Sequence, residues 1–357
     1  MISVLIKPAS SNCNLRCRYC FYKDETENRS VSSFGFMNDD TLENIISKML
    51  KFDSCTFSFQ GGEPLLAGLD FYKKYIELVN KYNTNNNEVY SSIQTNGILI
   101  DEKWCKFFKD NNFLVGLSID GPELLHDSCR VYGNDNGTYS DVIKAKKLLD
   151  EYEVEYNVLC VVTKYTYDKA KDIFEYLCDN GVYFHQYIPC MDYINGGSEY
   201  ALDSKEYGIF LNDLFDVWYE NICKGKEVSV RFFENVAGIL LGYYPESCGM
   251  SGNCTNQFVI EANGNVYPCD FYCLDEYLLG NINEDSIEKI NRRIDETDFI
   301  SSSRIHHEDC LNCEYYHLCN DGCKRDRVDN KSKYCEAYKS FYKHSLPILK
   351  AMLKTAN

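Results

Sequence analysis

The sequence lacks several features that would place it in a familiar class of protein. Nothing in its 357 residues approaches the roughly 18 consecutive apolar residues that a membrane-spanning helix needs. The N-terminus shows no charged region followed by an apolar core and a cleavage site, so we expect no signal peptide and a cytoplasmic protein. Solenoid repeats, low-complexity segments and flexible linkers are also missing. With 45% apolar and 25% charged residues, the composition is typical of a soluble globular protein.

Positive charge is scarce as well. The chain has 37 Lys and Arg residues against 54 Asp and Glu residues, which gives a formal net charge of -17. Nucleic-acid phosphates demand a basic face, so we expect no nucleic-acid partner, and nothing indicates a membrane partner. An acidic surface would tolerate a basic peptide.

Cysteine, in contrast, is abundant, with 19 residues. In a secreted chain this number would suggest disulfides, but cytosolic thiols stay reduced, and clustered cysteines there more often bind metal or do chemistry. Eleven of them fall into spaced groups near the two ends of the chain. We expect the other eight to be small buried apolar residues: Cys55, Cys105, Cys129, Cys160, Cys178, Cys190, Cys223 and Cys273.

Strand-like and helix-like segments alternate through the first two-thirds of the chain. Buried parallel strands are predicted at 3–7, 55–60, 88–96, 113–120, 155–163 and 182–189. Amphipathic helices are predicted at about 39–52, 70–82, 101–111, 139–152 and 167–180. Six βα repeats predict an α/β fold, an open, partial (β/α)6 barrel of the TIM type. In such a barrel the functional residues follow the C-terminal ends of the strands.

The last third of the chain changes character. A long helix is predicted at 204–224, followed by a β-hairpin that turns at Asn263-Gly264. A helix near 285–297, a cysteine-dense loop at 310–335 and a closing helix to about 354 complete the pattern. We therefore expect a barrel domain at 1–225 and a second domain at 226–357.

The first cysteine group lies directly after the first predicted strand. Cys13, Cys17 and Cys20 form a C-x3-C-x2-C motif. A [4Fe-4S] cluster has four irons and is usually held by cysteine thiolates, so three cysteines in one loop leave one iron open. A structural zinc loop is the alternative. The spacing, with Tyr19 just before the last cysteine, resembles the radical S-adenosylmethionine superfamily. The resemblance implies that the open iron chelates S-adenosylmethionine, whose cleavage gives a 5′-deoxyadenosyl radical.

Other residues fit the same superfamily. Gly61-Gly62-Glu63-Pro64 follows the second strand, where glycines allow close approach to a ligand and Glu63 offers acceptors for its ammonium group. Ser118 ends the fourth strand, and Arg130 follows with a forked guanidinium suited to a carboxylate or ribose. Taken alone, the GGEP segment would equally indicate a turn, and Arg130 a surface salt bridge.

The second cysteine group holds eight residues, enough for two fully ligated [4Fe-4S] clusters. A pair of zinc sites is the alternative, although zinc knuckles usually show two similar C-x2–4-C pairs and this set shows one. The members of the group are Cys248, Cys254, Cys269, Cys310, Cys313, Cys319, Cys323 and Cys335.

The order of these cysteines resembles the SPASM extension of radical S-adenosylmethionine enzymes. In that family the ligands interleave. The resemblance implies a first auxiliary cluster on Cys248, Cys254, Cys269 and Cys323. It implies a second on Cys310, Cys313, Cys319 and Cys335, so that the protein carries three clusters.

Longer segments narrow the family. The sequences SVLIKPASSNCNLRCRYCFY, FSFQGGEPLLAG, QTNG, FLVGLSIDGP and NVYPCDFY resemble those of the anaerobic sulfatase-maturating enzymes, and the likeness covers essentially the whole chain. Those enzymes convert a cysteine or serine of a sulfatase to Cα-formylglycine without oxygen. The resemblance therefore implies a sulfatase polypeptide as substrate and an electron donor such as a flavodoxin or ferredoxin. We expect a monomer.

The resemblance also implies roles for single residues. S-adenosylmethionine would contact Tyr19, Gly62, Ser118, Arg130 and Met191. Gln60 would face the substrate peptide. Asp270, next to Cys269, would be the catalytic base that takes the thiol or hydroxyl proton. From the residues alone, Asp270 could equally be a loop carboxylate that caps a turn.

Two other classes of function remain open. The same SPASM architecture serves enzymes that form thioethers or other crosslinks in small peptides, or epimerise their residues. Many of those carry an N-terminal leader-recognition domain, which we do not expect here because the cysteine loop begins at residue 13. A non-enzymatic electron carrier would need neither the GGEP motif nor a cluster with an open iron.

Overall fold

The computed structural model describes residues 2–355, which form two compact units. The first unit contains residues 2–119, 127–157 and 255–299, and the second contains residues 120–126, 158–254 and 300–355. The chain passes from one unit to the other within α5 (Glu123–Cys129) and β5 (Tyr156–Val162).

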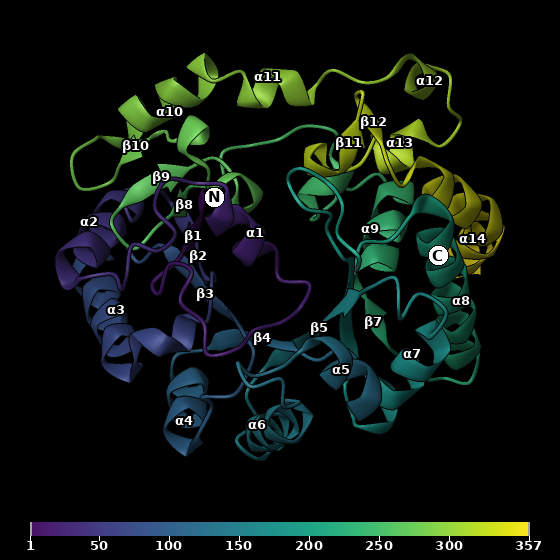
Figure 1. The fold of residues 1–357 in the computed structure, drawn as a ribbon, viewed down its shortest axis with the longest axis horizontal. Coiled ribbons are helices and arrows are strands. Elements are labelled where there is room, and N and C mark those ends of the chain that lie inside the picture. Colours follow the sequence, from purple (N-terminus) through teal and green to yellow (C-terminus); the bar gives the residue numbers. More distant parts are fainter. Residues whose placement is uncertain (1, 356–357) are drawn as a thin grey trace. The chain divides into compact units, whose positions relative to one another are not determined.

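Parallel strands form the centre of the first unit. Strand β2 pairs with both β1 and β3, and β4 pairs with β3, so that the order is β1-β2-β3-β4. Helices follow these strands in the chain and cover one face of the sheet (Figure 1). The strands are β1 (Ile2–Ile6), β2 (Ser54–Phe59), β3 (Glu88–Thr95) and β4 (Phe113–Ser118). The helices on this face are α2 (Asp39–Met49), α3 (Leu69–Tyr82), α4 (Glu102–Asp110) and α6 (Tyr139–Glu151), whereas α1 (Phe21–Glu27) lies apart from them.

Aromatic side chains fill the layer between this sheet and α3. The ring of Phe59 on β2 meets the rings of Tyr72 and Tyr75 edge-on, each at 5.0 Å between centroids. Phe113 on β4 packs against the same rings. Tyr72 and Tyr75 are three residues apart, so both side chains leave α3 on the face that meets the sheet. Phe59 is the last residue of β2, so this packing holds the strand end that leads into the GGEP segment.

A hairpin from the last third of the chain extends this sheet. Strand β8 (Val259–Ile260) pairs in parallel with β1, β9 (Asn265–Tyr267) pairs antiparallel with β8, and β10 (Gly280–Asn281) follows at the edge. The turn between β8 and β9 contains Gly264 with φ +88°, a conformation that glycine adopts at no steric cost. Asp270 follows β9, so it lies next to a strand of the sheet that also contains β1. Helix α10 (Ile287–Glu296) completes the unit.

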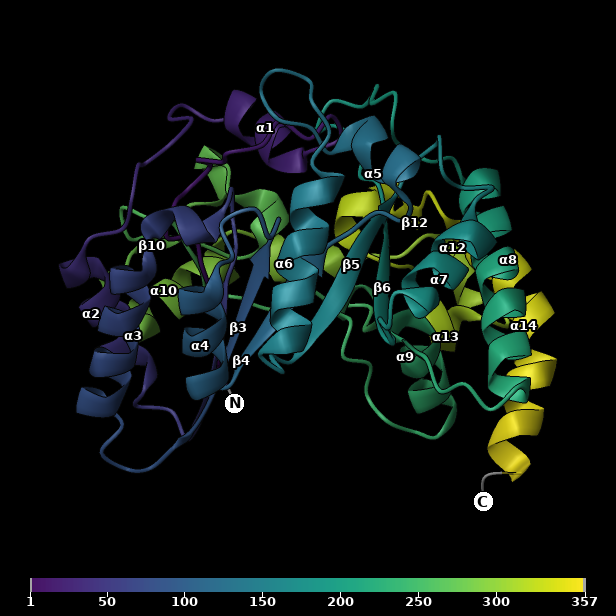
Figure 2. The same ribbon diagram turned by 90° about the horizontal axis from the view of Figure 1, so that it is seen from below.

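The second unit contains the remaining strands and the longest helices. β6 (Phe184–Pro189) pairs in parallel with β5 and with β7 (Ser229–Val230). Helices α8 and α14 lie side by side (Figure 2), and Gly208 of α8 lies so close to Ala337 that an added Cβ would meet its Cα at 3.2 Å. The helices are α7 (Ala170–Asp179), α8 (Ser204–Cys223), α9 (Arg231–Leu240), α11 (Phe299–Ser303), α12 (Glu308–Leu311), α13 (Tyr316–Cys319) and α14 (Cys335–Thr355). A two-stranded ribbon joins β11 (Arg327–Val328) to β12 (Lys331–Ser332).

The predicted α/β class with βα repeats is confirmed, and the strand ends differ from the predicted ones by at most two residues. Seven of the eight scattered cysteines are buried as expected. The expectation is wrong for Cys223, which is exposed because it is the last residue of α8, where the helix leaves the core. No helix of residues 2–355 combines the length and the apolar character needed to cross a bilayer. The domain boundary at 225/226 stays a prediction.

Candidate active site and cysteine-rich loops

The carboxylate of Asp270 lies in a buried polar group of the first unit. Asp270 follows β9 and is 5% exposed. Its Oδ2 accepts a hydrogen bond from the Tyr22 hydroxyl at 2.6 Å and another from the Gln60 side-chain amide at 3.0 Å. The Gln60 amide also donates to the Tyr22 oxygen at 2.9 Å. The structure thus brings together Gln60 and Asp270, which the sequence assigned to separate roles, and adds Tyr22, which the sequence analysis missed.

Lys7 lies on the other side of the same carboxylate. Its Nζ forms ion pairs with Asp270 Oδ1 at 3.7 Å, Glu25 at 3.1 Å and Glu261 at 3.2 Å. Asp270 Oδ1 itself accepts no hydrogen bond from any residue between 2 and 355. Burial raises the pKa of the Asp270 carboxyl above its ordinary value, and the charge of Lys7 opposes that shift. Oδ1 is thus held by the ion pair with Lys7 and not by a hydrogen bond, and a buried carboxylate with a raised pKa is suited to accept a proton from a group placed beside it.

A second buried cation completes this group of charges. Arg29 Nη1 donates to Glu261 Oε1 at 2.7 Å, and both side chains are fully buried. Burial of single charges is costly, and two cations here face three carboxylates. Burial raises the pKa of Glu25 and of Asp270. The charges of Lys7 and Arg29, in contrast, overcome burial and lower the pKa of Glu261. Lys7, Glu25, Arg29 and Glu261 were also missed from the sequence. One feature of the sequence could have indicated this group: the charged Lys7 stands directly after the apolar residues of the first strand.

The first cysteine loop runs between β1 and α1. The backbone N–H of Leu15 donates to Cys13 Sγ at 3.4 Å, and the Asn96 side chain approaches the same sulfur at 3.8 Å. Burial raises the pKa of the Cys13 thiol to about 11 and raises that of Cys20 as well. N–H groups aimed at sulfur favour a thiolate, so these residues fit a cluster whose irons displace the thiol protons.

Backbone pairing fixes this loop against the segment that carries Arg130. The N–H of Arg16 donates to the Val131 carbonyl at 2.7 Å, and the N–H of Arg18 donates to the Cys129 carbonyl at 2.9 Å. As a result the Arg130 guanidinium lies over the ring of Tyr19 at 5.5 Å from its centroid. Tyr19 and Arg130, predicted to share a ligand, are therefore neighbours beside the three cysteines.

The GGEP segment packs on the same loop. The N–H of Glu63 donates to the Asn12 carbonyl at 2.8 Å. Gly62 has φ +52°, and a Cβ at this position would lie 2.2 Å from the Asn12 oxygen. Only glycine fits here, because the close approach of the two backbones leaves no room for a side chain.

Replacing Gly62 with alanine should therefore push the GGEP segment away from Asn12 and displace the adjacent Cys13. We expect Gly62→Ala to lower the affinity for S-adenosylmethionine at least tenfold, measured by equilibrium binding to anaerobically reconstituted protein. Gly68→Ala is the matched control, because Gly68 also has positive φ but no atom within 4 Å of an added Cβ. Equal effects of the two substitutions would show that backbone strain alone, and not the close approach at Gly62, causes the loss.

Glu63, in the segment that follows β2, is buried against the end of β3. Its Oε1 accepts from the Leu65 N–H at 3.0 Å and the Thr95 hydroxyl at 2.8 Å, and its Oε2 accepts from the Asn96 N–H at 2.9 Å. Burial raises the pKa of Glu63 to about 7, although these hydrogen bonds oppose the shift. In the structure Glu63 therefore ties the GGEP segment to the QTNG segment, and its predicted contact with the ligand's ammonium stays a prediction.

The raised pKa of Glu63 predicts how stability changes with pH. Because the folded protein holds this proton up to about pH 7 and the unfolded chain releases it near pH 4.5, ionisation of Glu63 costs stability as pH rises through that window. Glu63→Gln removes this term. The wild type should lose stability as the pH rises from about 5.5 to 7, and the variant should not. The free energy of unfolding of the variant should therefore rise relative to that of the wild type by roughly 2 kcal/mol, at about 1.36 kcal/mol per pH unit. Urea titrations of both proteins measure the difference, and a constant difference would contradict the assignment.

The other two predicted ligand contacts occupy different units. Ser118 ends β4 in the first unit, where its hydroxyl accepts from the Gln94 side-chain amide at 3.1 Å. Met191 follows β6 in the second unit. Its contact with S-adenosylmethionine stays a prediction.

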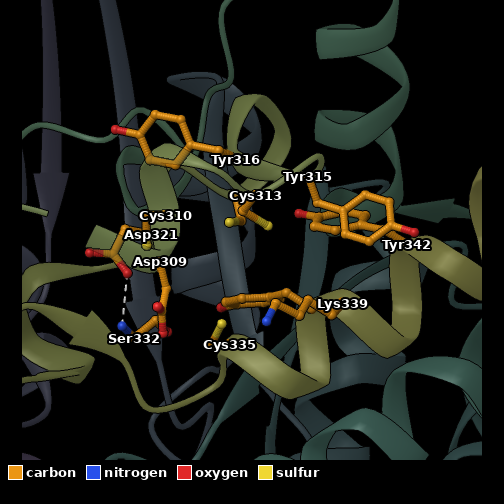
Figure 3. Close-up of a pocket in the computed structure, with 12 residues that line it drawn as sticks. Asp309, Cys310, Cys313, Tyr315, Tyr316, Asp321, Ser332, Cys335, Lys339 and Tyr342 are labelled. Atoms are coloured by element: carbon orange, nitrogen blue, oxygen red, sulfur yellow. Dashed lines mark hydrogen bonds between the residues drawn. The ribbon is translucent and has the colours of Figure 1, made fainter. Parts of the chain in front are cut away.

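Four cysteines of the second group surround one pocket in the second unit (Figure 3). They come from α12, the turn after it, the end of α13 and the start of α14, and they are Cys310, Cys313, Cys319 and Cys335. Burial raises the pKa of Cys310 to about 12 and that of Cys319 to about 11. This is the set of four that the family resemblance implies for one cluster.

Three of the remaining four cysteines are also neighbours in the second unit. Burial raises the pKa of Cys323 to about 12, and the nearby Cys248 and Cys254 thiolates contribute to the shift. Cys269 belongs to the first unit. Within residues 2–355, no group of three or more His, Cys, Asp or Glu side chains is placed to hold a single metal ion. A four-iron cluster needs a wider set of ligands, because each thiolate binds a different iron.

Comparison with known proteins adds the family. Residues 8–195 match the Radical SAM superfamily, and residues 248–314 match an iron-sulfur cluster-binding domain, SPASM. The chain is 46% identical to the cysteine-type anaerobic sulfatase-maturating enzyme of Clostridium novyi, over 99% of this chain and 98% of that protein. It is 30% identical to the serine-type anaerobic sulfatase-maturating enzyme of Klebsiella aerogenes, over 99% of this chain and 87% of that protein. The solved structure of native anSMEcpe with bound AdoMet and Cp18Cys peptide matches with a TM-score of 0.94 and 42% identity, over 100% of this chain and 99% of that one.

Proposed function

Because the chain belongs to the anaerobic sulfatase-maturating enzymes of the radical S-adenosylmethionine superfamily, we propose that its own target is a cysteine of a sulfatase. The protein oxidises its target residue to Cα-formylglycine, and it uses S-adenosylmethionine and three [4Fe-4S] clusters. Its greater likeness to the cysteine-type than to the serine-type relative supports cysteine as the target. The likeness to the cysteine-type relative carries the choice of cysteine, and the buried Asp270 carboxylate, held by Tyr22 and Gln60, supports a residue that accepts the target's proton.

The cysteine groups divide among the clusters in this proposal. Cys13, Cys17 and Cys20 hold the cluster that binds S-adenosylmethionine, in a loop of the 1–225 barrel domain. The 226–357 domain holds the two auxiliary clusters. The first auxiliary cluster binds to Cys248, Cys254, Cys269 and Cys323, and the second to Cys310, Cys313, Cys319 and Cys335. The shared pocket of the last four cysteines supports this division.

S-adenosylmethionine takes its place beside the first loop. Tyr19 and Arg130, stacked on one another, bind its adenosine or carboxylate portion, and Gly62 lets the backbone approach the methionine portion. Ser118 contributes from the end of β4. Met191 packs on the cofactor. When bound, the clusters and S-adenosylmethionine supply a 5′-deoxyadenosyl radical that removes a Cβ hydrogen, and they take up the released electron.

The chain's own residues manage the proton and the geometry. Asp270 Oδ1 accepts the proton of the target thiol, while Tyr22 and Gln60 hold Oδ2 and so fix the plane of the carboxylate. Gln60 also faces the substrate peptide. Lys7 neutralises part of the charge around Asp270. Loss of the thiol proton, the Cβ hydrogen and one electron leaves a thioaldehyde, which water converts to the aldehyde with release of hydrogen sulfide.

We further propose the cellular setting. Cluster ligands must be reduced thiols, which supports a cytoplasmic location. The electron for S-adenosylmethionine cleavage comes from a donor such as a flavodoxin or ferredoxin. The net charge of -17 supports a protein that binds neither nucleic acid nor membranes, and we propose that it works as a monomer.

Two peptides that differ in one atom test the choice of target. Each has the form cysteine/serine-x-proline-x-arginine and is incubated with reduced, reconstituted protein and S-adenosylmethionine. The cysteine peptide should lose about 18 mass units, because oxygen replaces sulfur and two hydrogens leave, and it should react at least tenfold faster than the serine peptide, which would lose about 2. Faster reaction of the serine peptide would overturn the proposal. A product that keeps its sulfur in a new crosslink would favour a peptide-modifying enzyme.

A further inference from the structure

One face of α14 lines the pocket of the four cysteines. The helix begins at the ligand Cys335, and Tyr338, Lys339 and Tyr342 follow at positions three, four and seven residues later. These spacings place all four side chains on one side of a helix. Figure 3 shows Tyr342 and Tyr315 with their rings side by side on the wall of the pocket.

The hydroxyl of Tyr342 is unusual among the groups on this wall. Tyr342 is 1% exposed, and its hydroxyl has no hydrogen-bond partner in the part of the chain from residue 2 to 355. Its ring packs against Tyr315 at 5.7 Å and Tyr338 at 6.4 Å between centroids. Buried hydroxyls almost always find a partner, so an unpartnered one in a ligand pocket indicates a group that accepts its proton there.

Two further observations identify the acceptor. Tyr342 lines the same pocket as the sulfur atoms of Cys310, Cys313, Cys319 and Cys335, so the contents of that pocket lie beside its phenol. The neighbouring Tyr315, in contrast, is partly exposed, and its hydroxyl is not among the buried groups that lack a partner. Of these two neighbouring tyrosines, Tyr342 is therefore the one whose buried hydroxyl is left for the contents of the pocket.

We propose that the Tyr342 hydroxyl donates a hydrogen bond to a sulfur of the cluster held by Cys310, Cys313, Cys319 and Cys335, and so raises the reduction potential of that cluster. The inference rests on the proposed ligand set. A hydrogen bond to a cluster sulfur stabilises the reduced, more negative cluster more than the oxidised one, and such bonds are among the factors that set cluster potentials. A higher potential makes this cluster the better electron acceptor, which suits an enzyme that must remove an electron from its substrate.

Tyr342→Phe tests the proposal, with Tyr315→Phe as the matched control in the same wall. Both substitutions are made in the full chain in which Cys13, Cys17 and Cys20 are alanine, so that only the auxiliary clusters give signals. Iron and sulfide are counted after anaerobic reconstitution, and the potentials are read from a redox titration followed by electron paramagnetic resonance. An exchangeable proton near the cluster is sought by electron–nuclear double resonance in H2O and D2O.

Tyr342→Phe should keep about eight irons, four in each auxiliary cluster. It should also shift the reduction equilibrium of one cluster at least tenfold towards the oxidised form, which is about 59 mV for one electron. The exchangeable proton coupling should disappear with it, and Tyr315→Phe should change neither. An unchanged potential in Tyr342→Phe, an equal shift in Tyr315→Phe, or loss of iron from Tyr342→Phe would each overturn the proposal. Fewer than eight irons in the parent protein would instead show that the ligand set is wrong.

Discussion

Replacing Cys13, Cys17 and Cys20 together with alanine is expected to remove about a third of the iron and to abolish cleavage of S-adenosylmethionine. Three clusters of four irons hold roughly twelve irons per chain, and only one of the three depends on this loop. The auxiliary clusters should remain, because their proposed ligands lie beyond residue 247. Iron analysis and chromatography of 5′-deoxyadenosine measure the two effects.

The matched control replaces three buried cysteines outside the cluster groups, Cys105, Cys160 and Cys178. It should leave the iron content unchanged, since these thiols serve only as core residues. Zinc bound in the C-terminal part, or only four irons in the wild-type protein after careful reconstitution, would contradict the assignment of three clusters.

Asp270→Asn is expected to lower aldehyde formation about a hundredfold or more while S-adenosylmethionine is still cleaved. Asparagine is nearly isosteric and can still accept from Tyr22 and Gln60, but its amide cannot take the proton of the target thiol. The iron content should stay at the wild-type value. Aldehyde and 5′-deoxyadenosine, measured in one reaction, separate the proton step from radical formation.

Asp275→Asn is the control for this substitution. Asp275 lies in the same segment, and its Oδ2 accepts a hydrogen bond from the exposed backbone N–H of Ser30 at 2.7 Å. The variant should keep normal activity. Loss of iron from Asp270→Asn would assign Asp270 a structural role, and a normal rate of aldehyde formation would remove it from the mechanism.

Local patterns were enough to predict much of the fold. The strands and helices of the first two-thirds follow from apolar periodicity, and the hairpin follows from Asn263-Gly264 at its turn. The parallel pairing of Leu5 with Val259 did not follow, because it joins segments some 250 residues apart and no local signal sets its register. No local pattern therefore indicated that this hairpin pairs with β1.

The same limit applies to the site. The cysteine motifs are visible because their ligands are close together in the sequence, and Asp270 was found through its neighbour Cys269. Lys7, Arg29 and Glu261 are charged residues in ordinary segments, and only the fold shows that they are buried together. Tyr22 could not be predicted either, because its hydroxyl donates to the Asp270 carboxylate, which is 248 residues away in the sequence.

The central claim is that this protein oxidises a target cysteine at Cβ, and a labelled substrate tests it most directly. A peptide whose target cysteine carries two deuterium atoms at Cβ is incubated with reduced, reconstituted protein and S-adenosylmethionine. The account predicts one deuterium in each 5′-deoxyadenosine formed during turnover, one deuterium kept in the aldehyde, and loss of sulfur from the peptide. Deoxyadenosine without deuterium, or a peptide that keeps both its deuterium atoms and its sulfur, would contradict it.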